Sequence, residues 1–120
     1  TEEVGLTARD VEVLGAFHDV MSITGLRVTP VLGFVGDLDL ARLSLGAGEV
    51  EGAFALTLRE LLDPKKRAVQ QLGPVRAPYF DAGPHPVLGL TALILDEVLR
   101  EALGLELAPA EQPEVPHPWR

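Results

Sequence analysis

Apolar residues recur between residues 11 and 35 in the way typical of two β-strands. Residues 11–20 and residues 27–35 are rich in valine and other β-formers, and each stretch predicts a strand. Residues 22–25 contain Ser, Thr and Gly and predict the turn that joins the strands. Pro30 lies inside the second stretch. Because proline cannot donate to a ladder, it predicts an edge or bulge position.

The pattern changes in the second half of the chain. Phe54, Leu56 and Leu58 alternate with smaller or polar residues, which predicts a short strand. This strand should run into a helix of one or two turns that ends at Asp63 and Pro64, since the residue before a proline disfavours helical geometry.

Residues 75–80 predict a further strand, and a helical period begins at Thr91. One apolar stripe of this helix comprises Leu95, Val98, Leu99, Ala102 and Leu103. Gly104 should end the helix, because glycine adopts the left-handed conformation that often follows a last turn. Strands and helices in this order indicate an α+β fold.

The last residues differ from the rest in composition. Residues 106–120 contain four prolines and little periodicity, and they predict a poorly ordered tail. The sequence therefore divides into a folded part, residues 1–105, and a proline-rich tail, residues 106–120.

Composition narrows the classes of partner. The 120 residues carry a formal net charge of −8, which disfavours nucleic acids and anionic membrane surfaces. The apolar stretch at residues 86–95 is much shorter than the roughly 20 residues of a membrane span. The chain has no cysteine, which excludes disulfides and thiol nucleophiles. No secretory signal is visible, and we expect a cytoplasmic location.

The chain starts with a carboxylate motif. Residues 1–6 read TEEVGL and resemble the last third of the Nudix box, with Glu2, Glu3, Gly5 and Leu6 on its final E, E, G and aliphatic positions. In the complete box a further glutamate lies three residues before Glu2 and four before Glu3. On a helix these offsets bring all three carboxylates near one face. Such a cluster suits Mg²⁺ or Mn²⁺, and the resemblance implies that Glu2 and Glu3 are metal ligands and that Glu3 is also catalytic.

Three further blocks are similar to the coenzyme A diphosphatase-like branch of the Nudix hydrolases. They are VTPVLGFV at residues 28–35, EVEGAFALTLRELLDP at residues 49–64 and GLTALIL at residues 89–95. Their fixed order makes the resemblance far more specific than any one block. Thr57 stands where the family usually has proline, and Leu88 replaces the tryptophan before GLT.

The resemblance also implies roles for two residues outside the box. Glu49 falls on the family's EV position, where a glutamate binds a metal or accepts a proton from the attacking water. Arg67 is a candidate contact for substrate phosphate or ribose, and a solvated basic turn with Lys65 and Lys66 is its alternative. The three histidines show no metal-ligand spacing.

The resemblance implies a Nudix fold, an α/β/α sandwich with a mixed sheet, represented here by its C-terminal part. The complete protein is expected to hydrolyse the diphosphate linkage of a small nucleoside diphosphate derivative, with coenzyme A or its thioesters favoured. The alternatives are ADP-ribose or NADH as substrate, or a non-catalytic binding scaffold. The 120-residue chain alone should be inactive, and the sequence leaves a homodimer open.

Overall fold

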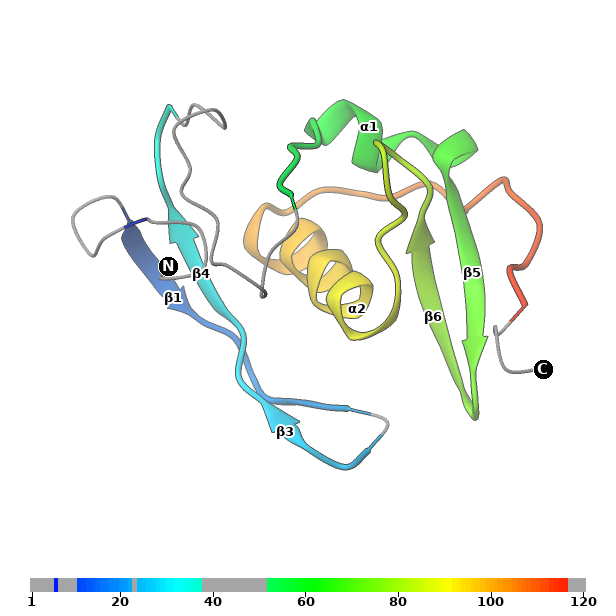
Figure 1. The fold of residues 1–120 in the computed structure, drawn as a ribbon, viewed down its shortest axis with the longest axis horizontal. Coiled ribbons are helices and arrows are strands. Elements are labelled where there is room, and N and C mark those ends of the chain that lie inside the picture. The colour runs from blue at the N-terminus through cyan, green and yellow to red at the C-terminus, as the bar shows by residue number, and fades with distance from the viewer. Residues whose placement is uncertain (1–5, 7–10, 23, 38–51, 117–120) are drawn as a thin grey trace. The chain divides into compact units, whose positions relative to one another are not determined.

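A computed structural model describes residues 6, 11–22, 24–37 and 52–116 of the chain. The chain divides into two compact units, Thr1–Ala55 and Leu56–Arg120, and each is described by itself. The described residues of the first unit form small sheets, and those of the second unit combine a hairpin with short helices, which gives an α+β architecture (Figure 1). In the described residues the sheets are three antiparallel pairs of strands, so the mixed sheet of the expected sandwich stays a prediction.

The first unit contains two short antiparallel pairs. Strand β1 (Glu12–Ala16) pairs with β4 (Val31–Phe34), and β2 (Val20–Met21) pairs with β3 (Arg27–Val28). Each of the two predicted strands is therefore split into two. The second splits at Pro30, which is buried and whose carbonyl accepts a hydrogen bond from Phe17 N–H at 2.9 Å.

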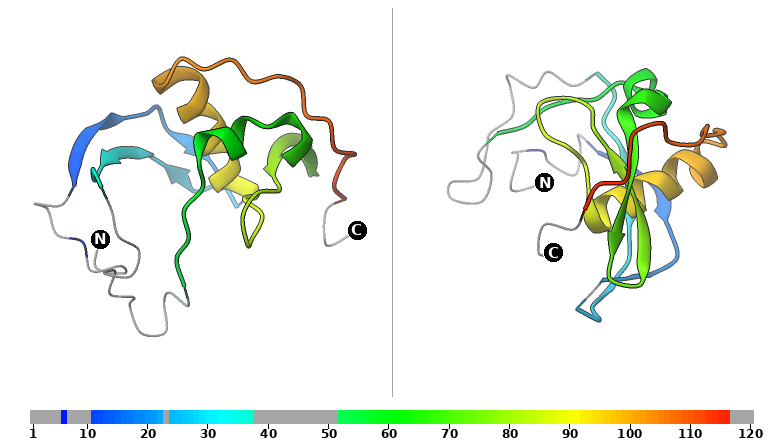
Figure 2. Two further views of the ribbon diagram at one scale, coloured as in Figure 1. Left: turned by 90° about the horizontal axis from the view of Figure 1, so that it is seen from above. Right: turned by 90° about the vertical axis from the view of Figure 1, so that its right-hand side faces the viewer.

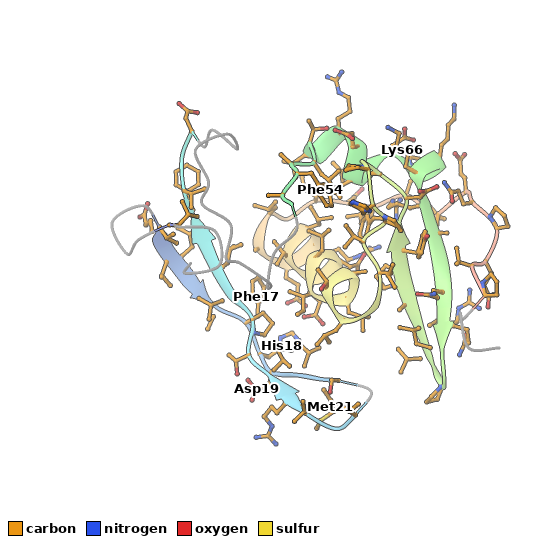
Figure 3. All side chains as sticks on the ribbon, in the orientation of Figure 1. Phe17, His18, Asp19, Met21, Phe54 and Lys66 are labelled. Carbon is orange, nitrogen blue, oxygen red and sulfur yellow. The ribbon has the colours of Figure 1, made fainter. Side chains whose placement is uncertain are left out.

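The predicted turn at residues 22–25 is confirmed. Gly25 has φ +85° and donates to Ser22 O at 3.0 Å, while Ser22 N–H donates to Leu26 O at 2.8 Å. Beyond the turn, the Asp19 carboxylate accepts a hydrogen bond from the Thr29 hydroxyl and lies 3.7 Å from Arg27 Nε (Figure 3). Glycine permits the positive φ of the turn. The contacts of Asp19 with Thr29 and Arg27 connect the two sides of this strand pair.

The second unit begins with a helix where a strand was predicted. Residues 52–57 form no strand, and α1 runs over Leu58–Leu62. Thr57 is its N-cap and forms a capping box with Glu60. This local hydrogen bonding starts a helix and overrides the alternation of Phe54, Leu56 and Leu58. The predicted end at Asp63 and Pro64 is confirmed, and a 3₁₀-helix, η2 (Pro64–Lys66), follows.

A β-hairpin follows η2. Strands β5 (Arg67–Leu72) and β6 (Val75–Phe80) pair antiparallel from Arg67↔Phe80 to Leu72↔Val75. The strand predicted at residues 75–80 is thus confirmed. Pro78 stands opposite Val69, whose carbonyl points away from β6 toward the C-terminal segment. The nitrogen of Pro78 therefore lies on the outer edge of β6, where no donor to β5 is needed.

Helix α2 (Gly89–Glu97) packs on β6 and continues into a π-helical turn, η3 (Val98–Ala102) (Figure 1). Leu99 is buried as predicted, whereas Leu103 is 48% exposed. Leu103 N–H bonds to Val98 O, five residues back, so the wider turn rotates the end of the predicted stripe away from the core. Gly104 has φ +63° and ends the helix as predicted.

One apolar cluster holds the second unit together. Its buried members are Leu61, Phe80, Ala92 and Leu99, and its partly buried members are Leu56, Val87, Leu95, Leu105 and Leu107. The cluster joins α1, β6, α2 and the segment after η3. Burial of apolar surface is the main favourable contribution to folding, so this cluster fixes the framework on which the hairpin and the C-terminal residues are arranged.

The C-terminal residues do not match the expected poorly ordered tail. Residues 106–116 return from the end of the helix to the outer side of β5 (Figures 1 and 2). There, Glu111, Gln112 and Val115 donate backbone hydrogen bonds to Pro64, Arg67 and Val69 at 2.8, 3.1 and 2.8 Å. Prolines limit the number of donors, but one bond to η2 and two bonds to the edge of β5 give the segment a defined path.

Candidate functional site

The sequence-predicted carboxylates lie outside the described residues. Glu2, Glu3 and Glu49 fall in residues 1–5 and 38–51, so their mutual geometry stays a prediction. Within the described ranges, no group of three or more His, Asp or Glu side chains is arranged to hold a metal ion. The proposed metal site therefore rests on the sequence motif.

Arg67 is the predicted site residue that the structure describes. It lies at the start of β5, where its N–H donates to Pro64 O and its carbonyl accepts from Gln112 N–H at 3.1 Å. The side chain is 6% exposed, and its Nη2 donates to the carbonyl of Ala108, 41 residues further along the chain. Nε has no hydrogen-bond partner among the described residues.

The electrostatic setting of Arg67 follows from this burial. Desolvation is the largest cause that lowers the pKa of the guanidinium, and the positive charge of Arg100 lowers it further. Asp96 and Asp63 act in the opposite direction. Arginine stays charged at neutral pH. Arg67 is therefore a buried cation that holds the C-terminal segment here, and its contact with substrate stays a prediction.

The neighbouring lysines differ from Arg67 in exposure. The Lys65 side chain is exposed, and that of Lys66 is partly exposed (Figure 3). The backbone carbonyls of both lysines accept hydrogen bonds from other segments. Lys65 O accepts one from Gln112 Nε2 at 2.9 Å, and Lys66 O accepts one from Asp81 N–H at 2.7 Å. The turn thus connects β5, the end of β6 and the C-terminal segment.

A capping box at α1 is a feature that our interpretation of the sequence missed. Thr57 Oγ1 accepts from Glu60 N–H at 3.1 Å, and the Glu60 carboxylate accepts from Thr57 N–H at 3.3 Å. The hydrogen bonds from Thr57, the backbone one first, lower the pKa of the Glu60 carboxyl. The spacing Thr-x-x-Glu before an apolar run was the signal for this box. It fixes the start of the helix that follows the EV motif.

The histidines within the described ranges occupy connections. His18 lies between β1 and β2, outside the strand in which it was predicted, and His85 lies in the turn before α2; both are exposed. Among the helices that the structure describes, none has the length and apolar character that crossing a membrane requires.

Comparison with known proteins identifies two similar enzymes. Mitochondrial coenzyme A diphosphatase NUDT8 of Homo sapiens is 36% identical over 104 residues, which cover 82% of this chain and 44% of that protein. The enzyme of the same name from Mus musculus is 33% identical over 104 residues, which cover 82% of this chain and 50% of that protein. The chain spans about half the length of these curated relatives.

Other comparisons add no relationship. No protein-family model matches the chain, and no solved structure matches it. The two similar enzymes are mitochondrial by name, which contradicts the predicted cytoplasmic location. Zero cysteines and the lack of a visible secretory signal carried that prediction, and neither feature separates the cytoplasm from other reducing compartments.

Proposed function

The chain is a relative of the coenzyme A diphosphatases of the Nudix type, and from this relationship we propose that the complete protein hydrolyses the diphosphate linkage of coenzyme A or its thioesters. The identity over 104 residues to two enzymes of that name carries the proposal. The order of the motifs at residues 1–6, 28–35, 49–64 and 89–95 agrees with it.

Glu2 and Glu3 are the proposed ligands of a divalent cation, with a further glutamate from the complete Nudix box. Mg²⁺ or Mn²⁺ bound there would acidify a water and offset charge on the departing phosphate. Glutamate oxygens are the ligand type that Mg²⁺ prefers. The net charge of −8 gives a second reason to propose a cation, because an anionic diphosphate would otherwise meet a protein of its own sign.

Glu49 is the proposed general base or an additional ligand. A carboxylate within hydrogen-bond reach of the attacking water would accept its proton as the oxygen forms a bond to phosphorus. The bond from that phosphorus to the bridging oxygen breaks, and two monophosphates leave. The glycines at positions 46 and 48 flank Ala47 and would let this loop approach the substrate.

Arg67 is proposed as a contact to substrate phosphate under one condition. Its guanidinium would have to leave the carbonyl of Ala108, to which it donates in this structure. A phosphate is the stronger acceptor, because a guanidinium binds it through two charge-assisted hydrogen bonds.

Product analysis of the complete protein tests the function. We expect release of a 3′,5′-ADP-type product from coenzyme A with Mg²⁺ or Mn²⁺ and none with excess EDTA, measured by chromatography. Equal turnover in EDTA would contradict the metal role. Hydrolysis of ADP-ribose or NADH without coenzyme A would replace the substrate assignment, and absence of all three activities in folded, metal-loaded protein would favour a binding scaffold.

The 120-residue chain on its own should show no detectable hydrolysis. It carries two of the proposed box carboxylates, and Mg²⁺ gives up its water ligands reluctantly unless several oxygens are held close together. Calorimetric titration with Mg²⁺ and the same chromatographic assay check this expectation. Robust activity of this chain would show that the catalytic residues have been misplaced.

A further inference from the structure

Residues 108–116, which we call the C-terminal strap, lie against β5 without burying a side chain. Each of these residues is exposed or partly exposed. The apolar residues just before the strap, Leu105 and Leu107, pack against the core instead. Because apolar burial supplies most of the stability of a small domain, the strap depends mainly on its polar contacts.

The backbone contacts of the strap fall on the outer edge of β5 and on η2, which precedes it. Glu111, Gln112 and Val115 supply the three N–H groups described above, and the Gln70↔Val115 bridge is parallel. The three prolines at positions 109, 113 and 116 have no N–H to donate. The strap is therefore an extended segment that meets β5 through one isolated β-bridge and two backbone hydrogen bonds, and it does not extend the two-stranded sheet.

Arg67 is the buried anchor of the strap. Its Nη2 donates to Ala108 O, the first carbonyl of the strap, while Nε has no partner within the described part of the chain. A buried cation recovers its desolvation cost best from a carboxylate or phosphate, and a neutral carbonyl compensates it less. The hydrogen bond to Ala108 O still favours the closed strap, and release of the strap would let the guanidinium bind water in its place.

Two further side chains of the strap, those of Gln112 and Glu114, make contacts on the surface. Gln112 Nε2 donates to Lys65 O at 2.9 Å and to Asp81 Oδ2 at 3.2 Å. Glu114 lies 3.6 Å from Arg76 Nη1, with side chains 51% and 64% exposed. Exposed ion pairs contribute little, so Gln112 is the stronger of these two anchors.

We propose that the strap opens as one unit while the β5–β6 hairpin and its core stay folded, with Arg67 and Gln112 as the contacts that hold it closed. Segments with exposed hydrogen bonds and few buried apolar contacts open locally, at a lower free energy than global unfolding requires. Opening uncovers the outward carbonyls of Arg67 and Val69 on β5, and it frees the Arg67 guanidinium.

Native-state hydrogen exchange of the 120-residue chain measures this opening and does not require the protein to be an enzyme. The amides of Glu111, Gln112 and Val115 should exchange with similar protection. Their protection factors should be at least about 10-fold lower than those of Ala68 and Gln70 within the hairpin. Equal protection of strap and hairpin amides would overturn the proposal, because both would then open only together.

Two variants test the anchors. Gln112→Ala should raise strap exchange by about 10-fold, the effect of losing one or two hydrogen bonds, and leave hairpin exchange unchanged. Glu111→Ala is the matched control, since the contact described for Glu111 uses its backbone N–H, and it should change neither. Arg67→Met should also accelerate strap exchange. If Gln112→Ala changes strap and hairpin exchange by the same factor, or changes neither, the strap is not a separate unit.

Discussion

Replacing Thr57 by valine removes the hydroxyl that caps α1 and keeps the β-branched shape. Thr57 Oγ1 accepts from Glu60 N–H at 3.1 Å and donates to Glu60 Oε1 at 3.0 Å. Loss of a threonine N-cap costs about 0.5–2 kcal/mol, and about 1 kcal/mol is the central expectation for Thr57→Val. The Thr57 N–H bond to Glu60 at 3.3 Å can persist in the variant, so the full upper value is not expected.

Urea denaturation at pH 7, followed by circular dichroism, measures this change. Thr57→Ser is the matched control because it keeps the hydroxyl, and its free energy of unfolding should stay within about 0.5 kcal/mol of the parent chain. In a thermal melt, 1 kcal/mol corresponds to a decrease in Tm of about 4–8 °C for a domain of 60–100 residues. If valine and serine at position 57 give the same stability as threonine, the capping box does not stabilise the unit.

The pH dependence of the same variants gives an independent check. The hydrogen bonds from Thr57 lower the folded-state pKa of Glu60 below its ordinary value of 4.5. The stabilisation is therefore present above that value and is lost as pH falls through the lowered folded pKa. The difference between the parent chain and Thr57→Val should shrink in acid. A difference that grows as pH falls would contradict the role assigned to the Glu60 carboxylate.

Four further outcomes are expected. Leu99→Ala should lower the free energy of unfolding by about 2–5 kcal/mol in urea denaturation, because the side chain is 1% exposed. The control Leu103→Ala, at a side chain 48% exposed, should cost about 0.5 kcal/mol or less. Gly104→Ala should cost about 1–2 kcal/mol in the same assay, because φ is +63° and an L residue adopts this conformation only with strain. A Cβ at this position would meet no atom within 4 Å, so no steric clash adds to the cost. In the complete protein, steady-state kinetics at saturating metal should show kcat lowered about 10²-fold or more by Glu49→Gln and little by Glu51→Gln, and the reverse ranking would show that the EV motif is out of register.

Local backbone chemistry explains the predictions that the structure confirms. Gly25 at the first turn, Pro64 after α1 and Gly104 after the last helical turn each specify a conformation through their own covalent structure. Thr57 and Glu60 belong to the same class, because a spacing of three residues defines a capping box. The Thr-x-x-Glu spacing is visible in the sequence, but the alternation of nearby apolar residues led us to predict a strand there.

The candidate site also combines features that the sequence predicts with features that it could not predict. The sequence motifs identified the relationship to the coenzyme A diphosphatases, which the two similar enzymes support. Glu2, Glu3 and Glu49 stay predictions from those motifs. The environment of Arg67 could not be predicted, because its acceptor is the carbonyl of Ala108, 41 residues away. Backbone carbonyls carry no sequence signature, since every residue type has one.

The sequence by itself determined the turns, the ends of helices, one strand of the hairpin and the family relationship, because each depends on residue types a few positions apart. The tertiary structure decided that residues 106–116 follow β5 and that η3 rotates Leu103 away from the core. It also decided that Arg67 is buried. The path of residues 106–116 and the burial of Arg67 come from hydrogen bonds between segments distant in the sequence, which the core around Phe80 and Leu99 brings together.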